Sequence, residues 1–320
     1  MFPNTLFDPR FPRIRNFLNP LNLLTTMAFV VDFDGTVTTK DTIYELGKYA
    51  SIIQRERDRG DFEFSWEEIV SAYGTDYRAY VEAYVPCESE RTSYAQEVEF
   101  LRGLSHVDAR SRQRVEDLGL FAGVGDLVLR DATSPFTRST KPVGIRRGFK
   151  EFVAAAKQAG IAVAVVSVNW STAFIQAAIQ DLDIEVIANR VTEDGKILGP
   201  PGILEDGRVI STSHDKRMAL ESITAGRLDT PRRSLLYVGD SLTDLECLCS
   251  CPGVVMAEES NSSLLRALSR VGKRVGPIGE SGAWDKDNAS LHWARDFLEL
   301  LDSSLVQSLL LHEKAASTSV

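Results

Sequence analysis

The sequence predicts an α/β fold in which a Rossmann-like parallel sheet is flanked by helices and an α-helical cap domain is inserted into the chain. Short apolar runs are typical of buried parallel strands, and segments of helical periodicity alternate with them. A chain of 320 residues, 43% of them hydrophobic, can bury such a core and one modest second unit. The expected parts are an N-terminal extension over 1–26, the core over 27–40 and 144–300, the helical cap over 41–143 and a C-terminal tail over 301–320.

The first strand is predicted over the apolar run 29–31, and Gly35 and Thr36 mark the loop that ends it. Asp32 and Asp34 therefore lie at the carboxyl end of a strand, where open α/β sheets bind their ligands. Side chains two apart in extended chain point to opposite faces, but a loop can turn both toward one point. We interpret Asp32 as a nucleophile and Asp34 as an acid/base.

Two such acids suit phosphoryl transfer, which needs a nucleophile and a proton carrier for the leaving oxygen. A carboxylate that attacks a phosphate dianion is repelled by it. A hard cation such as Mg²⁺, held by carboxylates and a backbone carbonyl, together with an ammonium group, would offset this repulsion. We therefore expect later motifs to supply these groups.

The segment 41–143 is too long for an ordinary crossover helix and carries its own helical patterns. Thr42 and Glu45 have the spacing of a capping box, which predicts the start of a helix. A helical lid at this place would close over the site, exclude water and select the substrate.

Four tyrosines in the cap recur at helical spacing and share one face of a helix: Tyr73, Tyr77, Tyr80 and Tyr84. They could form an aromatic wall over a flat or apolar leaving group. For most of them we favour packing on the inner face of the cap, because tyrosine rings bury well while the hydroxyl stays in water.

A helix is predicted over 148–159, with Gly160 as its stop, and the apolar run IAVAVV that follows predicts the second core strand. Ser167 ends this strand and is placed to hydrogen-bond a phosphoryl oxygen, although a serine there is often only a turn residue. Ser171 is expected to cap the next helix. Trp170 could stack on a substrate ring or pack in the core.

The next part of the chain predicts a short hairpin around Asp194 and Gly195 and then a helix that contains Lys216 in its first turn. A lysine is unfavourable at that end of a helix dipole, so another group is expected to hold it there. On this residue alone, a solvated surface lysine is the simpler interpretation.

The last motif is the apolar run 235–239, predicted as a buried strand, with Asp240 directly after it and Asp244 on the next helix. We expect Asp240 to be a direct metal ligand. Asp244 would hold a water or the lysine, or it would only complement the helix dipole.

Taken together, DFDGT, the serine after IAVAVV, the lysine and GDSLTD resemble the four motifs of the haloacid dehalogenase superfamily of phosphohydrolases. The resemblance extends from Met27 to the early 290s. It implies that Asp32 forms an aspartyl-phosphate, and that Asp34 protonates the leaving group and then activates water. An acid at position 34 also favours a phosphatase over a dehalogenase.

The same resemblance implies the remaining parts of the site. The expected phosphate-binding residues are Ser167, Asn169 and Lys216. The expected Mg²⁺ ligands are Asp32, the backbone carbonyl of Asp34 and Asp240, and the supporting residues are Thr36, Gly239 and Asp244.

The predicted hairpin and the position of the cap resemble the phosphoserine-phosphatase-like branch of the superfamily, which acts on small phosphomonoesters. The runs VVSVNWS and SGAWDKDNASLHWARDF are similar to the phosphatase domain of plant thiamin monophosphate phosphatases and to fungal proteins of the superfamily. Thiamin monophosphate or an isoprenoid phosphate is therefore a specific substrate hypothesis.

Three other functions could use some of the same motifs. The letters GDSL at 239–242 are the signature of a serine esterase family, but they stand late in the chain and no Asp-x-x-His pair follows them. A calcium loop starting at Asp32 fails, because Val37 and Ile43 stand where glycine and glutamate are needed. A non-catalytic binding protein on the same scaffold is the alternative that is not an enzyme.

Composition argues against nucleic-acid and membrane partners and is compatible with the small phosphorylated metabolite that the resemblance implies. A net charge of −9 does not suit nucleic acid, and no apolar run approaches the length of a membrane span. The four cysteines do not form a disulfide framework or a zinc pattern, which predicts reduced packing residues in a cytoplasmic protein. The prolines of 1–26 favour a loose extension over a mitochondrial presequence.

Overall fold

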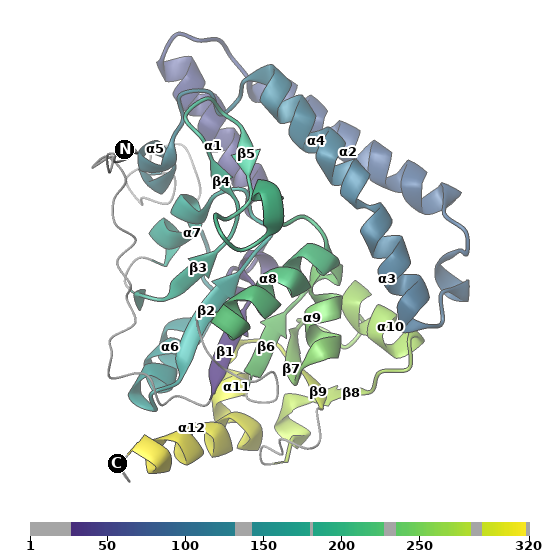
Figure 1. The fold of residues 1–320 in the computed structure, drawn as a ribbon, viewed down its shortest axis with the longest axis vertical. Helices are drawn as coiled ribbons and strands as arrows, with labels where there is room; N and C mark the ends of the chain where they lie inside the picture. Colours follow the sequence, from purple (N-terminus) through teal and green to yellow (C-terminus); the bar gives the residue numbers. More distant parts are fainter. Residues whose placement is uncertain (1–26, 132–142, 180–181, 227–234, 283–289, 318–320) are drawn as a thin grey trace, which may run out of the picture.

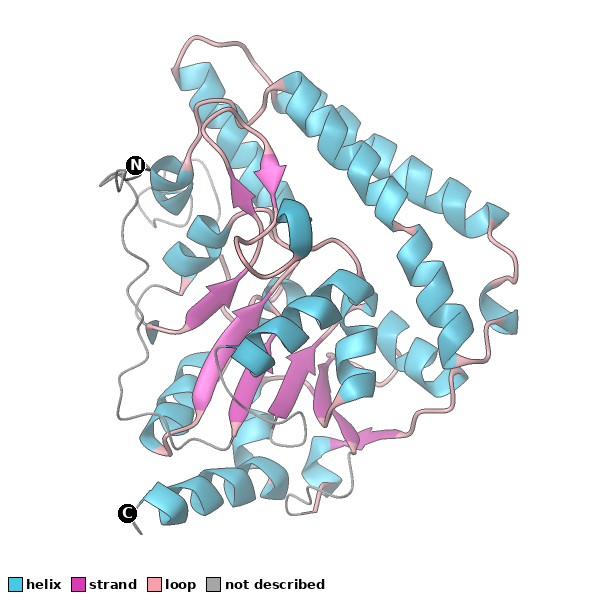
Figure 2. Ribbon diagram, in the orientation of Figure 1, coloured by secondary structure: helices cyan, strands magenta, loops and turns pink. Residues whose placement is uncertain are grey.

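The computed structural model describes residues 27–131, 143–179, 182–226, 235–282 and 290–317. Its centre is a seven-stranded sheet with helices on both faces (Figures 1 and 2). The strand order is β3-β2-β1-β6-β7-β9-β8, and all neighbouring strands run parallel. The predicted α/β class with a parallel sheet is confirmed.

The strands of this sheet are β1 (Ala28–Val31), β2 (Ala162–Val166), β3 (Glu185–Ile187), β6 (Leu235–Gly239), β7 (Gly253–Met256), β8 (Val275–Pro277) and β9 (Leu291–Ala294). The predicted hairpin is also confirmed, because β4 (Arg190–Val191) and β5 (Ile197–Leu198) pair antiparallel. The helices of the core are α6 (Phe149–Gln158), α7 (Thr172–Ala178), α8 (Ser213–Gly226), α9 (Leu245–Ser250), α10 (Ser263–Arg270), α11 (Phe297–Asp302) and α12 (Ser304–Ser317).

The central strand β1 shows how the sheet is buried on both faces. Phe29 and Val31 pack into one apolar cluster with residues of α6, α11 and α12, whereas Ala28 and Val30 pack into a second cluster with residues of α8, α9 and α10. All four side chains are fully buried. Because both faces are covered, the sequence of β1 is continuously apolar and does not alternate.

Between β1 and β2 the chain forms the inserted helices α1 (Ile43–Glu56), α2 (Glu63–Ala83), α3 (Tyr94–Gly103), α4 (Ser105–Leu118) and α5 (Asp126–Asp131). Helices α2 and α4 pack against each other, and α3 packs against α8 of the core (Figure 1). This arrangement agrees with the predicted helical insertion. The domain boundaries themselves stay a prediction.

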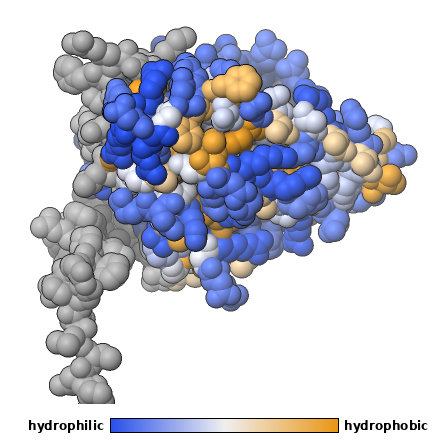
Figure 3. All heavy atoms as spheres, turned by 90° about the horizontal axis from the view of Figure 1, so that it is seen from above, coloured by the Kyte–Doolittle hydropathy of each residue, from blue (hydrophilic) through white to orange (hydrophobic). Residues whose placement is uncertain are grey.

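The surface seen from above gathers hydrophobic side chains in the middle of the face, among hydrophilic ones (Figure 3). Val70 and Tyr73 of α2 are exposed at 39% and 38% and line a cavity that is described below. Apolar surface that remains exposed beside a cavity is typical of a binding site.

The C-terminal segment corrects one expectation. The range 301–320 was expected to be a tail, but α12 occupies most of it, and Leu305, Val306 and Leu309 are buried in the core. The extension 1–26 lies outside the described residues. None of the helices in the described segments is both long enough and apolar enough to cross a membrane.

A buried ion cluster joins the insertion to the core. Glu97 of α3 is 1% exposed, and its Oε2 accepts hydrogen bonds from Arg91 Nε at 2.9 Å and from Arg270 Nη2 at 2.7 Å. Arg270 belongs to α10 of the core, and its Nε donates to the backbone oxygen of Arg91 at 3.0 Å. The Arg91 guanidinium also lies 3.8 Å from the centroid of the Phe100 ring. The cluster therefore fixes α3 to α10.

We expect Glu97→Gln to lower the free energy of unfolding by about 3 kcal/mol, because it leaves buried guanidinium groups without their shared carboxylate. Urea denaturation followed by circular dichroism measures the change. Glu99→Gln, on the same helix but exposed, is the matched control and should change stability by less than about 0.5 kcal/mol. Equal effects of the two substitutions would contradict the role of the cluster.

Candidate active site

The parallel register brings the predicted motifs to one edge of the sheet. Strand β1 lies between β2 and β6, so the carboxyl ends of all three strands are adjacent. Asp32 follows β1, Ser167 follows β2 and Asp240 follows β6. The backbone nitrogen of Asp32 donates to the oxygen of Val238 at 2.8 Å, which extends the pairing into the site.

Lys216 lies between two carboxylates. Its side chain is fully buried, and Nζ is 2.6 Å from Asp32 Oδ1 and 2.6 Å from Asp244 Oδ1. Burial alone would lower the pKa of Lys216, but the Asp244 and Asp32 carboxylates raise it above its usual value. The residue is therefore a charged, positioned ammonium group and not a solvated surface lysine.

Asp244 holds this lysine and is itself held by several donors. It is fully buried, and its carboxylate accepts hydrogen bonds from Tyr237 Oη at 2.7 Å and from the backbone nitrogens of Asp240 and Ser241 at 3.1 and 3.0 Å. Of the roles considered from the sequence, contact with the lysine is the one the structure shows. With its oxygens occupied, Asp244 acts as a positioning residue.

Two glycines make room for the acids. Gly35 has φ +75°, and a Cβ at this residue would lie 2.2 Å from Asp240 Oδ2. A Cβ at Gly239 would lie 2.3 Å from Asp244 Cγ. Since real Cβ atoms do not approach so closely, any other residue at either position would move a carboxylate of the site.

The acids fit a divalent cation. One carboxylate oxygen each of Asp32, Asp240 and Asp244 lies within 4.8 Å of the other two. Burial, with the neighbouring Asp244, raises the pKa of Asp240 to about 7, and burial raises the pKa of Asp32 as well, although Lys216 opposes it. Three carboxylates, two of them buried and one partly buried, face one ammonium group and leave an excess of negative charge, and hard oxygen ligands suit Mg²⁺.

Asp34 is held differently from Asp32. Its Oδ1 accepts from the hydroxyl and the backbone nitrogen of Thr42 at 2.5 and 2.8 Å, and its Oδ2 accepts from Asn169 Nδ2 at 2.8 Å. Burial and the Asp41 charge raise the pKa of Asp34 to about 6, while these three donors lower it. A carboxyl with such a pKa can give and take a proton near neutral pH.

One prediction changes at this point. Helix α1 begins at Ile43 as expected, but the capping box was wrong, because Thr42 makes no side-chain cap and its hydroxyl bonds Asp34. The amide nitrogen of Asn169 donates to Asp34 and Thr42, and its oxygen accepts from Ser171 N at 3.1 Å, so Asn169 positions Asp34. Its phosphate-binding role stays a prediction.

Ser167 and the supporting residues lie where the motifs put them. Ser167 Oγ is buried and accepts from Asn169 N at 3.0 Å, which leaves its proton free for another acceptor. Thr36 Oγ1 donates to Asp240 Oδ1 at 2.8 Å. Ser171 caps α7 as predicted, accepting from Phe174 N at 3.1 Å. The phosphate-binding role of Ser167 stays a prediction.

Sequence reasoning missed Arg146, which holds the loop after β1. Its side chain is 9% exposed and donates to the backbone oxygens of Gly35 at 2.6 Å, Thr36 at 3.0 Å and Arg295 at 3.0 Å. No local pattern in KPVGIRRGF distinguishes Arg146 from Arg147. Arg146 can bind the loop after β1 only because the chain returns to that loop after the inserted helices.

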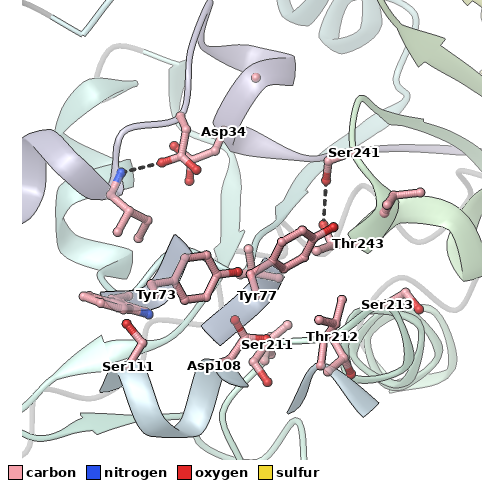
Figure 4. A pocket seen from close by; sticks show the side chains of 18 of the residues that line it. Asp34, Tyr73, Tyr77, Asp108, Ser111, Ser211, Thr212, Ser213, Ser241 and Thr243 are labelled. Carbon is pink, nitrogen blue, oxygen red and sulfur yellow. Dashed lines mark hydrogen bonds between the residues drawn. The ribbon is translucent and has the colours of Figure 1, made fainter. Parts of the chain in front are cut away.

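A cavity of about 600 Å³ opens over these groups. Asp32, Asp34 and Asp240 of the core line it. Tyr73 and Asp108 line it from the inserted helices, across from Asp34 (Figure 4). The predicted site acids therefore face a space large enough for a small molecule.

Of the four tyrosines expected on one helix face, three lie in α2 and Tyr84 follows its end, and they divide between substrate contact and packing. Tyr73 and Tyr77 line the cavity. Tyr80 stacks on Phe100 with ring centroids 5.4 Å apart, and Tyr84 meets the same ring edge-on at 5.0 Å. Only the first pair of the four can contact a molecule in the cavity.

Trp170 packs against other rings and also lines the cavity, while its stacking on a substrate ring stays a prediction. It lines the cavity, and it meets Trp66 and Phe121 edge-on with ring centroids 6.2 Å apart in each case. Its orientation is therefore fixed by packing, and it still presents surface to the cavity.

The esterase interpretation finds no support at Ser241. Its hydroxyl pairs with Thr243 Oγ1 at 2.8 Å and with Asp244 Oδ2 at 3.4 Å. Among the hydrogen bonds of the described residues, none joins Ser241 to a histidine, and His292 pairs with Ser290. No disulfide joins the four cysteines, all of which lie in the described residues, and the compartment of the protein stays a prediction.

Comparison with known proteins identifies the family of the chain. The sequence matches the model of the haloacid dehalogenase-like hydrolases over residues 29–248. The chain belongs to this family, and it is a hydrolase. The CTO1 family protein C17G9.12c of Schizosaccharomyces pombe is 27% identical over 263 residues, which cover 76% of this chain and 86% of the relative.

Two solved structures are also similar to this chain. One is phosphoserine phosphatase in its apo form, with a TM-score of 0.47 and 16% identity over 87% of this chain and 98% of the other. The second is a phosphoserine phosphohydrolase-like protein from Francisella tularensis subsp. tularensis, with a TM-score of 0.46 and 13% identity over 86% and 98%.

We expect Asp108→Asn to raise the melting temperature by a few degrees more at pH 8 than at pH 4.5. Burial and the Asp215 charge raise the pKa of Asp108 to about 7, against the Tyr73 hydroxyl and Arg112, which lower it. A folded pKa above the unfolded value means that stability falls as pH rises from about 4 to about 7. Because asparagine does not ionise, the Asp108→Asn protein should not lose this stability as pH rises.

Differential scanning calorimetry of both proteins measures the shift. The matched control is Asp117→Asn, because Asp117 lies on the same helix but is exposed. An equal change at both pH values for Asp108→Asn would show that this carboxyl titrates normally.

Proposed function

We propose that this protein is a phosphatase that hydrolyses a small phosphomonoester through an aspartyl-phosphate. The observation that carries the proposal is the contact between Asp32 and the buried Lys216 at 2.6 Å, with Asp240 beside them under a cavity. This arrangement offers a nucleophile and positive charge at one place. Membership of the hydrolase family supports the same chemistry.

In the first step, a carboxylate oxygen of Asp32 attacks phosphorus and the bond from phosphorus to the alcohol oxygen breaks. The leaving oxygen takes the proton of Asp34, whose raised pKa suits this transfer. Lys216 offsets the repulsion between the carboxylate and the phosphate. The Ser167 hydroxyl donates to a phosphoryl oxygen.

In the second step, a water molecule attacks phosphorus and passes its proton to Asp34. The bond between phosphorus and the Asp32 oxygen breaks, which releases inorganic phosphate and restores both carboxyl groups. The inserted helices over the cavity limit access of bulk water to the phosphoryl group.

A Mg²⁺ ion would be held by Asp32, Asp240 and the backbone carbonyl of Asp34. It would supply positive charge to the phosphoryl oxygens, which the single lysine does not balance alone. The excess of carboxylates over cations described above supports this assignment.

Thiamin monophosphate and isoprenoid phosphates are the specific esters that the sequence resemblance suggests. Trp66, Tyr73 and Trp170 line the cavity. Their rings support a leaving group that itself carries a ring, such as the thiamin of thiamin monophosphate. A panel that contains both esters beside simple alkyl phosphates tests the choice.

We expect Asp32→Asn to lower phosphate release in the presence of Mg²⁺ by at least about a thousandfold, because the amide is a poor nucleophile of nearly the same shape. Phosphate release from a panel of metabolite phosphates measures it. Ser241→Ala should lose less than about tenfold in the same assay. An inactive Ser241→Ala protein beside an active Asp32→Asn protein would favour the serine esterase, and a folded protein that releases no phosphate would favour a binding protein.

We expect kcat/KM to fall as pH rises through about 6, because the first step needs protonated Asp34. Thr42→Val removes a hydroxyl that lowers the pKa of Asp34, so the falling limb should move to higher pH, by roughly one unit. Thr42→Ser keeps the hydroxyl and should keep the wild-type profile. Identical profiles for the valine and serine variants would remove Asp34 as the titrating acid.

A further inference from the structure

The cavity over the candidate active site is unusual in its charge. Its charged lining residues are Asp32, Asp34, Asp41, Asp108 and Asp240. Within the described part of the chain, no lysine, arginine or histidine lines this cavity. Lys216 lies buried beside Asp32 and serves the phosphate end of the site. The end that would hold the leaving group has no cation to receive an anion.

Asp108 is the acid at that end. It projects from α4 into the cavity on the wall opposite Asp34, and Tyr73 and Tyr77 lie between them in the view of Figure 4. Its side chain is half-buried, and it takes part in none of the ion pairs found among the described residues. The raised pKa of this carboxyl reflects its burial. Such a group lowers stability unless a ligand compensates it.

Aromatic rings surround the same space. Trp66, Tyr73, Tyr77 and Trp170 all line the cavity, together with Tyr44 at its rim. The faces of such rings attract cations, and their bodies bury apolar surface. An acid among aromatic rings is the combination that binds an organic cation.

We infer that the substrate is the phosphate ester of an alcohol that carries a positive charge on an apolar or aromatic body, and that Asp108 recognises this charge. The inference rests on the proposed phosphatase function and names its substrate class. A carboxylate or a second phosphate on the leaving group would face Asp108, with no cation among the described residues that line this end of the cavity. A neutral leaving group would cover Asp108 and leave it with the Tyr73 hydroxyl as a hydrogen-bond partner but without a cation in contact.

Three esters of matched shape test the inference: 4-(trimethylammonio)benzyl phosphate, its neutral isostere 4-tert-butylbenzyl phosphate, and 4-carboxybenzyl phosphate. We expect kcat/KM to be at least about tenfold higher for the cationic ester than for the neutral one, and lowest for the carboxylate. A neutral or carboxylate ester that is hydrolysed as well as the cationic one would overturn the inference.

Substitution of Asp108 shows whether this residue carries the preference. Asp108→Asn should reduce the ratio of kcat/KM between the cationic and neutral esters by about five- to tenfold, because it removes a single charge contact. The ratio cancels differences in intrinsic reactivity between the esters. Asp117→Asn, on the exposed side of the same helix, should leave the ratio unchanged. The same ratio in all three proteins would overturn the role of Asp108.

A binding measurement separates this inference from the proposed function. The Asp32→Asn protein retains the cavity, and Trp66 and Trp170 in its wall report binding through their fluorescence. We expect the same order of affinities for the three esters there, with the cationic ester first. Equal affinities would overturn the inference even if Asp32-dependent hydrolysis were found, whereas the expected order without any hydrolysis would overturn only the phosphatase.

Discussion

The buried contact of Lys216 with Asp32 and Asp244 is the interaction on which the site depends. An ammonium group can remain charged at full burial only when carboxylates compensate it, and here two lie 2.6 Å from its nitrogen. The contact joins α8, the end of β1 and the turn after β6, which are far apart in the sequence. Removing Lys216 would leave two buried carboxylates without their shared cation, and removing either carboxylate would leave the ammonium with one partner instead of two. The same contact therefore orders the site and stabilises the fold.

The loop after β1 is held from outside the motif that forms it. Arg146 binds the backbone oxygens of Gly35 and Thr36, and Thr42 binds the carboxylate of Asp34. The acids are thus set by the two ends of the helical insertion, where the chain leaves the core and where it returns. This connects the chemistry of the core to the position of the helices that line the cavity.

Much of this arrangement could be predicted from the sequence, because the carboxyl ends of buried strands are recognisable. Asp32, Ser167 and Asp240 each follow an apolar run, and adjacent parallel strands bring them together. The choice of hydrogen-bond partners could not be predicted in the same way. The Thr42 hydroxyl has the spacing of a cap yet bonds Asp34, and Arg146 and Asp108 show no local signal, since both gain their roles from chain segments distant in sequence.

The ion cluster of Glu97, Arg91 and Arg270 limits how the inserted helices can move relative to the core. It fastens α3 to α10, and separating these helices would expose a carboxylate and two guanidinium groups that bind each other in a dry environment. This edge of the insertion is therefore expected to stay attached to the core. Any movement of the inserted helices relative to the sheet would have to occur at helices other than α3.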